Sequence, residues 1–171
     1  MVVTVINTGG TWNKVYDPRD GSLKVPQDNN ALNPILALSF ANIDWDLHGI
    51  IYKDSLEMTE HDREELCETI KKGRSNKVII VHGTDTMEET ARYLDHRLQN
   101  EGSLYHIVLI GAMIPYSIDP QEALFHFGLA LGALQGEKQG LFIAMHGLVL
   151  PYEAITKNRQ MGRFESKLIN I

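Results

Sequence analysis

Two short polar segments of the chain combine small residues with side chains that can act as nucleophiles. The first is residues 7–11 (Asn-Thr-Gly-Gly-Thr), which directly follows an apolar run. Adjacent glycines let the backbone turn tightly and approach a ligand closely. Thr11 would present its hydroxyl beside that turn. Taken alone, a Thr-Gly-Gly-Thr segment is more often a plain turn, so its meaning depends on what accompanies it.

The second polar segment is residues 81–86 (Val-His-Gly-Thr-Asp-Thr), where an apolar run ends and a helix-like stretch begins. The first N–H groups of a helix lack partners within the helix and suit an anion or a developing oxyanion. A structural interpretation also stands, because Thr86 could serve as the N-cap and Asp85 would favour the positive helix end.

The hydrophobic pattern predicts the strands and helices that flank these two segments. Short runs rich in Val and Ile alternate with longer helix-like stretches, and each run is apolar on both faces. The predicted strands are residues 2–6, 49–52, 78–81, 107–110 and 141–145. This alternation predicts an α/β fold: a doubly wound, mainly parallel sheet with helices on both faces, in a single domain over residues 1–171.

Helix-capping patterns set the expected helices. Thr59 with Asp62 reads as a capping box, and similar signals open two later helices. We therefore expect helices at about residues 59–73, 86–98 and 119–136, with a weaker one at 31–40. Residues 17–30 are rich in Pro, Gly, Asp and Asn and predict a long loop, either a lid or a disordered segment.

Ligands of such sheets bind where the carboxyl ends of the strands open into loops. Residues 8–11, 82–86 and 111–116 follow the first, third and fourth predicted strands. The polar motifs should therefore meet at one edge of the sheet.

Composition narrows the class of protein further. A net charge of −6 argues against binding to nucleic acid, which needs clustered Lys and Arg. Cys67 is the single cysteine, no apolar run reaches bilayer-spanning length, and the N-terminus reads as a strand, so we expect a cytoplasmic protein without membrane contact. The seven histidines lack metal-site spacing. We expect no metal and no cofactor, and a structural role for His82.

Taken together, the two polar segments resemble the two signature motifs of the bacterial-type L-asparaginase family. Three further matches follow in the order of that family: residues 54–59 (Asp-Ser-Leu-Glu-Met-Thr), 111–115 (Gly-Ala-Met-Ile-Pro) and Thr156-Lys157. The resemblance spans essentially the whole chain and corresponds to the N-terminal catalytic domain of the family.

The resemblance implies an amidohydrolase that acts on the side-chain amide of L-asparagine, or on a related small amide, and releases ammonia. Thr11 matches the primary threonine nucleophile. Thr84 matches a second essential threonine, which forms a triad-like group with Asp85 and Lys157.

The resemblance also implies a set of substrate contacts. Ser55 and Asp85 match residues that hold the α-carboxylate and α-ammonium groups, and the backbone of Ala112 matches a contact to the scissile amide. Backbone N–H groups at the glycine turn and at the helix start, Gly10 and Gly83, are the candidate oxyanion donors.

The chemistry has a physical basis beside the resemblance. An alcohol is a poor nucleophile unless a base takes its proton, and a desolvated neutral lysine can do so. Asp85 beside Lys157 favours the charged ammonium and opposes this use. A substrate ammonium group facing Asp85 would relieve part of that conflict.

The chain departs from the family pattern at three points. It ends soon after the lysine segment, so we expect no C-terminal asparaginase domain in it. In the family that domain lends an acidic residue through a neighbouring subunit. Leu56 stands where many relatives have a polar residue that contacts substrate. The lid tyrosine has no clear match, with Tyr16 nearest and Leu23 in another plausible alignment.

Two other readings stay open beside the enzyme: a catalytically weak ligand-binding module, and a subunit of an amidotransferase-like assembly. Retention of both threonines and the lysine favours the enzyme. A second apolar stripe on the predicted third helix, Phe125, Leu129 and Ala133, predicts a homo-oligomer unless the C-terminal segment 161–171 covers it.

Overall fold

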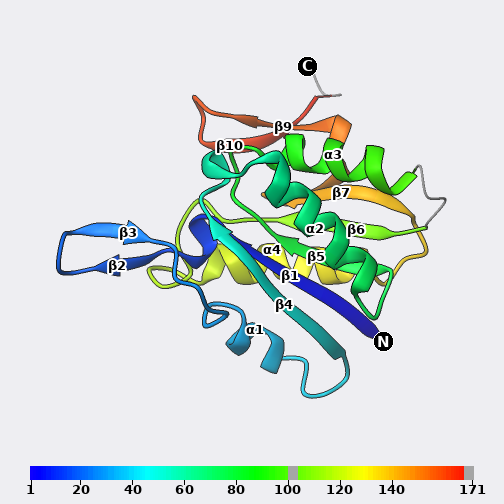
Figure 1. Ribbon diagram of the computed structural model, residues 1–171, viewed down its shortest axis with the longest axis horizontal. Coiled ribbons are helices and arrows are strands. Elements are labelled where there is room, and N and C mark those ends of the chain that lie inside the picture. The colour runs from blue at the N-terminus through cyan, green and yellow to red at the C-terminus, as the bar shows by residue number, and fades with distance from the viewer. Residues whose placement is uncertain (100–103, 168–171) are drawn as a thin grey trace.

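The computed structural model describes residues 1–99 and 104–167. Its centre is a six-stranded sheet in the order β4-β1-β5-β6-β7-β8 (Figure 1). The first five strands are mutually parallel, and β8 runs antiparallel to β7. The bounds are β1 (Val2–Gly9), β4 (Asp44–Lys53), β5 (Lys77–Val81), β6 (His106–Ile110), β7 (Gly140–Met145) and β8 (Leu148–Pro151). The predicted mainly parallel α/β fold is confirmed.

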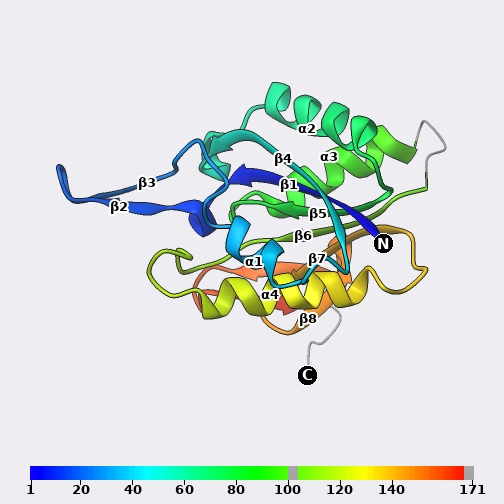
Figure 2. The same cartoon turned by 90° about the horizontal axis from the view of Figure 1, so that it is seen from below.

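Helices cover both faces of this sheet (Figure 2). On one face lie α1 (Asn33–Ala37) and α4 (Gln121–Ala133), and on the other lie α2 (Glu60–Lys72) and α3 (Met87–Gln99). The strand β5 illustrates the consequence: Val78 and Ile80 pack with α2 and α3, whereas Ile79 and Val81 pack with α1 and α4. The strand sequences are apolar on both faces because neither face meets water.

The predicted capping box at the start of α2 is present. The Thr59 hydroxyl accepts from the N–H of Asp62 at 3.3 Å, and the Asp62 carboxylate accepts from the N–H of Thr59 at 2.7 Å. The helix at 31–40 is shorter than expected. It ends before Phe40 and Ala41, which adopt positive φ angles of 48° and 66° that a helix cannot contain.

Several short elements fall outside the sequence expectations. Within the predicted loop 17–30, part of the chain pairs as a hairpin of β2 (Val15–Asp17) and β3 (Ser22–Lys24). Asp17 accepts hydrogen bonds from Arg19 and Lys24, which hold its pKa well below the usual range. The remaining elements are β9 (Ile155–Asn158), β10 (Arg163–Ser166), and the 3-10 helices η1 (Thr11–Asn13), η2 (Ser55–Glu57) and η3 (Tyr152–Ala154). Among the described residues, no helix is long and apolar enough to cross a bilayer.

The sheet has a switch point between β1 and β5. The two strands are neighbours, but the chain leaves β1 toward β4 at one edge and leaves β5 toward β6 in the opposite direction. In sheets of this kind, ligands usually bind beyond the carboxyl ends of the strands at such a switch point. Both polar motifs follow these two strands.

Candidate active site

The glycine turn after β1 and the loop after β5 touch through their glycines. Gly9 and Gly10 have φ angles of 104° and 75°, a region that favours glycine. A Cβ added to Gly10 would lie 2.5 Å from the backbone nitrogen of Gly83. Thr11 and Thr84 each follow one of these contacting glycines, so the contact brings both threonine-bearing segments to one place.

A pair of buried asparagines supports the turn from below. Asn7 and Asn13 exchange side-chain hydrogen bonds of 2.9 and 2.8 Å, and the Asn13 amide also donates to the Gly9 carbonyl at 2.8 Å. The Asn7 amide donates further to Asn29 at 2.9 Å, which ties in the segment before α1. This role of Asn13 was not predicted from the sequence. Its position two residues after Thr11 was the only available signal.

Thr84, Asp85 and Lys157 meet side chain to side chain. The Lys157 ammonium nitrogen lies 2.8 Å from the Thr84 hydroxyl oxygen and 2.9 Å from one Asp85 carboxylate oxygen. Thr84 is buried and the Lys157 side chain is 14% exposed. Lys157 reaches this point from β9, which pairs with β10 as an antiparallel hairpin beside the sheet. The structure thus brings together three residues that are 72 and 73 positions apart in the chain.

Arg159 joins this group and was missed by sequence reasoning. Its guanidinium donates to the same Asp85 carboxylate oxygen at 2.9 Å and to the Asp85 carbonyl oxygen at 3.3 Å. Arg159 lies two residues after Lys157 at the end of an extended segment. Side chains two residues apart in an extended segment point to the same side. The spacing of two residues from Lys157 was therefore the sequence signal that could have identified Arg159.

The chain reaches Ser55 through an irregular end of β4. Ile51 and Tyr52 have positive φ angles of 70° and 52°, and the β1–β4 register shifts between Asn7 and Gly9. A β-branched residue in this region is a strained conformation, costing on the order of 1–3 kcal/mol. The extra residues turn the chain so that the loop after β4 lies against the glycine turn.

This loop also corrects one expectation. The N–H of Gly10 donates to the Lys53 carbonyl at 2.8 Å, so it is not free to bind an oxyanion. The N–H of Gly83 has no hydrogen-bond partner among the described residues and stays available as a donor. The two N–H groups differ because the glycine turn lies against the end of β4, a contact that the sequence alone could not reveal.

Ser55 is buried directly against Gly83. The side chain is 1% exposed, and a Cβ added to Gly83 would lie 2.6 Å from the Ser55 hydroxyl oxygen. That hydroxyl has no hydrogen-bond partner among the described residues. The Thr86 hydroxyl donates to the Ser55 carbonyl at 2.9 Å, which fastens the loop to the start of α3. Thr86 therefore has a role beyond the capping position expected from sequence.

Charged and apolar side chains surround Ser55. Asp54 accepts from Lys14 at 2.7 Å and from the N–H of Leu56 at 3.1 Å. Burial opposes the charged form of Asp54, but these two donors outweigh it and lower the pKa. Leu56 is 66% exposed and, with Leu23 of the hairpin, lines a cavity of about 460 Å³. Tyr16, the other lid candidate, pairs across the hairpin with Leu23 and is largely exposed.

Ala112 lies in a loop that α4 holds in place. A Cβ added to Gly111 would lie 2.6 Å from the His82 carbonyl oxygen, so this loop packs tightly against the one that carries Thr84. The Glu122 carboxylate accepts from the N–H groups of Met113 at 3.0 Å and Ile114 at 2.9 Å. Ala112 itself is 1% exposed.

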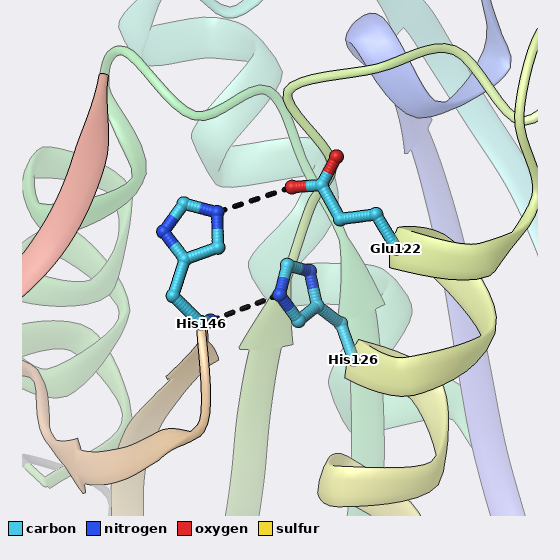
Figure 3. Close-up of side chains that lie close together, drawn as sticks. All are labelled: Glu122, His126 and His146. Carbon is cyan, nitrogen blue, oxygen red and sulfur yellow. Dashed lines mark hydrogen bonds and ion pairs between the residues drawn. The ribbon is translucent and has the colours of Figure 1, made fainter. Parts of the chain in front are cut away.

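Glu122, His126 and His146 gather beside this loop, although their spacing in sequence gave no metal-site signal (Figure 3). Their candidate ligand atoms all lie within 4.8 Å of one another. Glu122 and His126 are four residues apart on α4, which was the one available hint.

The hydrogen bonds of this cluster fix how its nitrogens are used. His126 lies with Nδ1 2.8 Å from the Gly111 carbonyl and accepts the N–H of His146 at Nε2. His146 accepts the N–H of Phe164 at Nδ1, which leaves Nε2 to donate to Glu122 at 3.1 Å. Burial lowers the pKa of His126. The three residues thus form a hydrogen-bonded relay from the Ala112 loop to β10.

His82 is fully buried between the two threonine-bearing loops. Its Nδ1 lies 2.7 Å from the Gly83 carbonyl, and burial lowers its pKa to about 4. The ring is therefore neutral near pH 7. The Nδ1 contact ties the ring to the loop that carries Thr84, and the buried Nε2 has no hydrogen-bond partner among the described residues.

Comparisons with known proteins agree with this arrangement. Residues 2–167 match the family described as Asparaginase, N-terminal. The glutaminase-asparaginase of Acinetobacter glutaminasificans is 28% identical, over 91% of this chain and 49% of that protein. The chain thus spans about half the length of this relative.

Two solved structures share the fold. The thermostable L-asparaginase from Thermococcus kodakarensis superposes with a TM-score of 0.80 at 20% identity, covering 97% of this chain and 51% of that one. A probable cytoplasmic L-asparaginase from Campylobacter jejuni gives a TM-score of 0.67 at 23% identity, covering 96% and 51%. The match over nearly all of its residues identifies this chain as a member of the asparaginase family, corresponding to its N-terminal domain.

Proposed function

We propose that this domain hydrolyses the side-chain amide of asparagine, or of a related small amide, with a threonine as nucleophile. The observation that carries the proposal is the 2.8 Å contact between the Lys157 nitrogen and the Thr84 hydroxyl, beside the turn that bears Thr11. A lysine side chain hydrogen-bonded to a buried hydroxyl is the arrangement that general-base activation of an alcohol requires.

In the proposed reaction, a threonine oxygen attacks the amide carbon and its proton passes to the neutral amine of Lys157. The N–H of Gly83 and the backbone of Ala112 are the candidate groups for stabilising the tetrahedral oxyanion. The carbon–nitrogen bond then breaks, and the proton returns to the leaving nitrogen to give ammonia. Water hydrolyses the resulting threonine ester, which restores the hydroxyl and releases a carboxylic acid.

In this proposal Ser55 and Asp85 face the part of the substrate beyond the amide. The buried Ser55 hydroxyl, which has no partner among the described residues, is a donor for a substrate carboxylate. Because the chain spans about half of its matched relative, activity must be measured on this chain itself.

The direct test is ammonia release by the purified chain from L-asparagine, L-glutamine and their D-isomers. Turnover of any of these supports the enzyme. Binding without ammonia release supports the alternative of a ligand-binding module. The third alternative, a subunit of an amidotransferase-like assembly, requires that ammonia appear only after a partner protein is added.

We also propose a cytoplasmic location. The chain has one cysteine, Cys67, which is buried, and one structural relative is described as a probable cytoplasmic enzyme. Measuring the protein in separated cytoplasmic and periplasmic fractions tests this.

Leu56 should limit the affinity for asparagine. It is exposed next to Ser55, where an apolar side chain offers no hydrogen bond to a polar substrate. Leu56→Gln should tighten asparagine binding by about 0.5–1.5 kcal/mol, the usual value of one added hydrogen bond. Calorimetry measures this, with Leu38→Gln as a control because Leu38 is similarly exposed, at 59%, but lies just after α1. An unchanged or weaker affinity for Leu56→Gln would show that residue 56 does not contact the substrate.

We propose a homo-oligomer that associates through α4. Phe125 is 54% exposed, and a groove of about 750 Å³ runs along Gly128, Leu129 and Gly132 toward β7 and β8. The described end of the chain does not cover it, since Phe164 of β10 packs in the core on the α2–α3 face. Residues 168–171 lie outside the described part, so the alternative that segment 161–171 covers the stripe is tested only up to residue 167.

Light scattering at micromolar concentration should therefore give more than one subunit. Phe125→Glu should shift the protein toward the monomer, because a carboxylate is costly to bury in an apolar interface. Phe40→Glu is the matched control, since Phe40 is 84% exposed but does not line this groove. A wild-type monomer at this concentration would contradict the proposal.

A further inference from the structure

The carboxylate of Asp85 is shared by two cations. Lys157 and Arg159 both donate to the same oxygen, Oδ1, at 2.9 Å each. Arg159 makes a second contact to the Asp85 carbonyl oxygen at 3.3 Å. When Lys157 is the neutral base of the proposed reaction, Arg159 alone balances the formal charge of Asp85. When Lys157 is protonated, the group carries a net charge of +1, within a chain whose net charge is −6.

The position of Arg159 is fixed by the turn that follows it. The Asn158 side-chain oxygen accepts the N–H groups of Gln160 and Met161, both at 3.1 Å, and its amide donates to Glu165 on β10 at 3.0 Å. The Asn158 side chain thus fixes the turn both to the residues that follow it and to β10. Arg159 itself is 64% exposed and keeps guanidinium N–H groups that can reach a ligand.

A substrate ammonium group would meet an unfavourable charge at this place. It would share the Asp85 carboxylate with Arg159 and lie close to the positive charge of that guanidinium, and to that of Lys157 when Lys157 is protonated. The other carboxylate of the site, Asp54, is already paired with Lys14 at 2.7 Å. A ligand that has a carboxylate but no ammonium avoids this cost and can gain a contact to the free guanidinium N–H groups.

We propose that Arg159 is a specificity-determining residue that directs the site toward small amides without a free α-ammonium group. The chemical class is a monoamide of a dicarboxylic acid in which the amino group is absent or acylated. This inference rests on the proposed amidohydrolase function and names its substrate class.

The test compares ammonia release from succinamate, which is asparagine without its amino group, with release from L-asparagine. We expect the wild-type chain to have the higher kcat/KM with succinamate. Arg159→Gln should shift the ratio of the two kcat/KM values toward asparagine by about fivefold, the effect of removing one partly exposed charge contact. Arg159→Lys should retain most of the wild-type preference. Arg163→Gln is the control, since Arg163 lies on the same hairpin but pairs with Glu165.

Binding of the two product acids separates the claim about the ligand class from the claim of hydrolase function. Calorimetry with succinate and L-aspartate should give tighter binding of succinate by the wild-type chain, and Arg159→Gln should remove that preference. If this pattern appears without any ammonia release, the ligand class stands and the hydrolase function is wrong. If asparagine and aspartate are preferred and Arg159→Gln leaves both ratios unchanged, the inference is overturned while turnover still supports the hydrolase. Failure to bind either acid overturns the inference as well.

Discussion

Thr84→Val should lower kcat by about 10²–10⁴-fold, the usual loss when a group that takes part in proton transfer is removed. Thr84 is buried, and its hydroxyl contacts Lys157. Valine has nearly the same shape, so the fold should be retained. Lys157 keeps its contact to Asp85 in this variant, which leaves no charge unpaired.

Thr11→Val should cause a loss of the same order. The Thr11 hydroxyl makes no hydrogen bond to another described residue, so its removal leaves no polar partner unsatisfied. The loss should appear in kcat far more than in substrate binding, because the hydroxyl acts in the reaction rather than in holding the ligand.

Thr69→Val is the matched control for both variants. The Thr69 hydroxyl bonds only within α2, to the Glu65 carbonyl, at 2.8 Å. Ammonia release under saturating substrate measures kcat, and thermal melting checks the fold. A variant at position 11 or 84 that keeps near-normal kcat would remove that threonine from the proposed mechanism.

The second large effect concerns Lys157. Lys157→Met should reduce kcat by at least about 10²-fold, because the base that takes the hydroxyl proton is lost. Removing one partner of a paired charge often destabilises a protein by leaving the other unpaired. Here Arg159 still contacts the Asp85 carboxylate at 2.9 Å, so we expect a melting temperature close to that of the wild type.

Lys167→Met is the control for this variant, since Lys167 also forms an ion pair, with Glu88 at 2.7 Å, but does not contact Thr84. Ammonia release and melting curves are measured for both. Full activity of Lys157→Met with normal melting would show that another group accepts the proton.

Local sequence signals were sufficient to predict the main elements of the fold. Strands apolar on both faces, the capping box of Thr59 with Asp62, and the glycine after α2 are local signals, and local signals do not depend on distant contacts. These signals also placed the two threonine-bearing motifs at the carboxyl ends of two predicted strands, and the structure shows that these strands are neighbours. The charged hairpin β2–β3 and the short helix α1 were less predictable, because their residues favour turns as much as regular structure.

The arrangement of the site depends on contacts that form only in the folded domain. The contact between Gly10 and Gly83, the loss of the Gly10 N–H to Lys53, and the arrival of Arg159 at Asp85 all join residues far apart in the chain. The same holds for the relay that contains His126 and His146. Side-chain pattern predicts which face of an element is buried, but not which polar group lies opposite. A hydrogen bond tolerates a variation of only about a few tenths of an ångström in the distance between donor and acceptor. Only the packed fold fixes distances that closely.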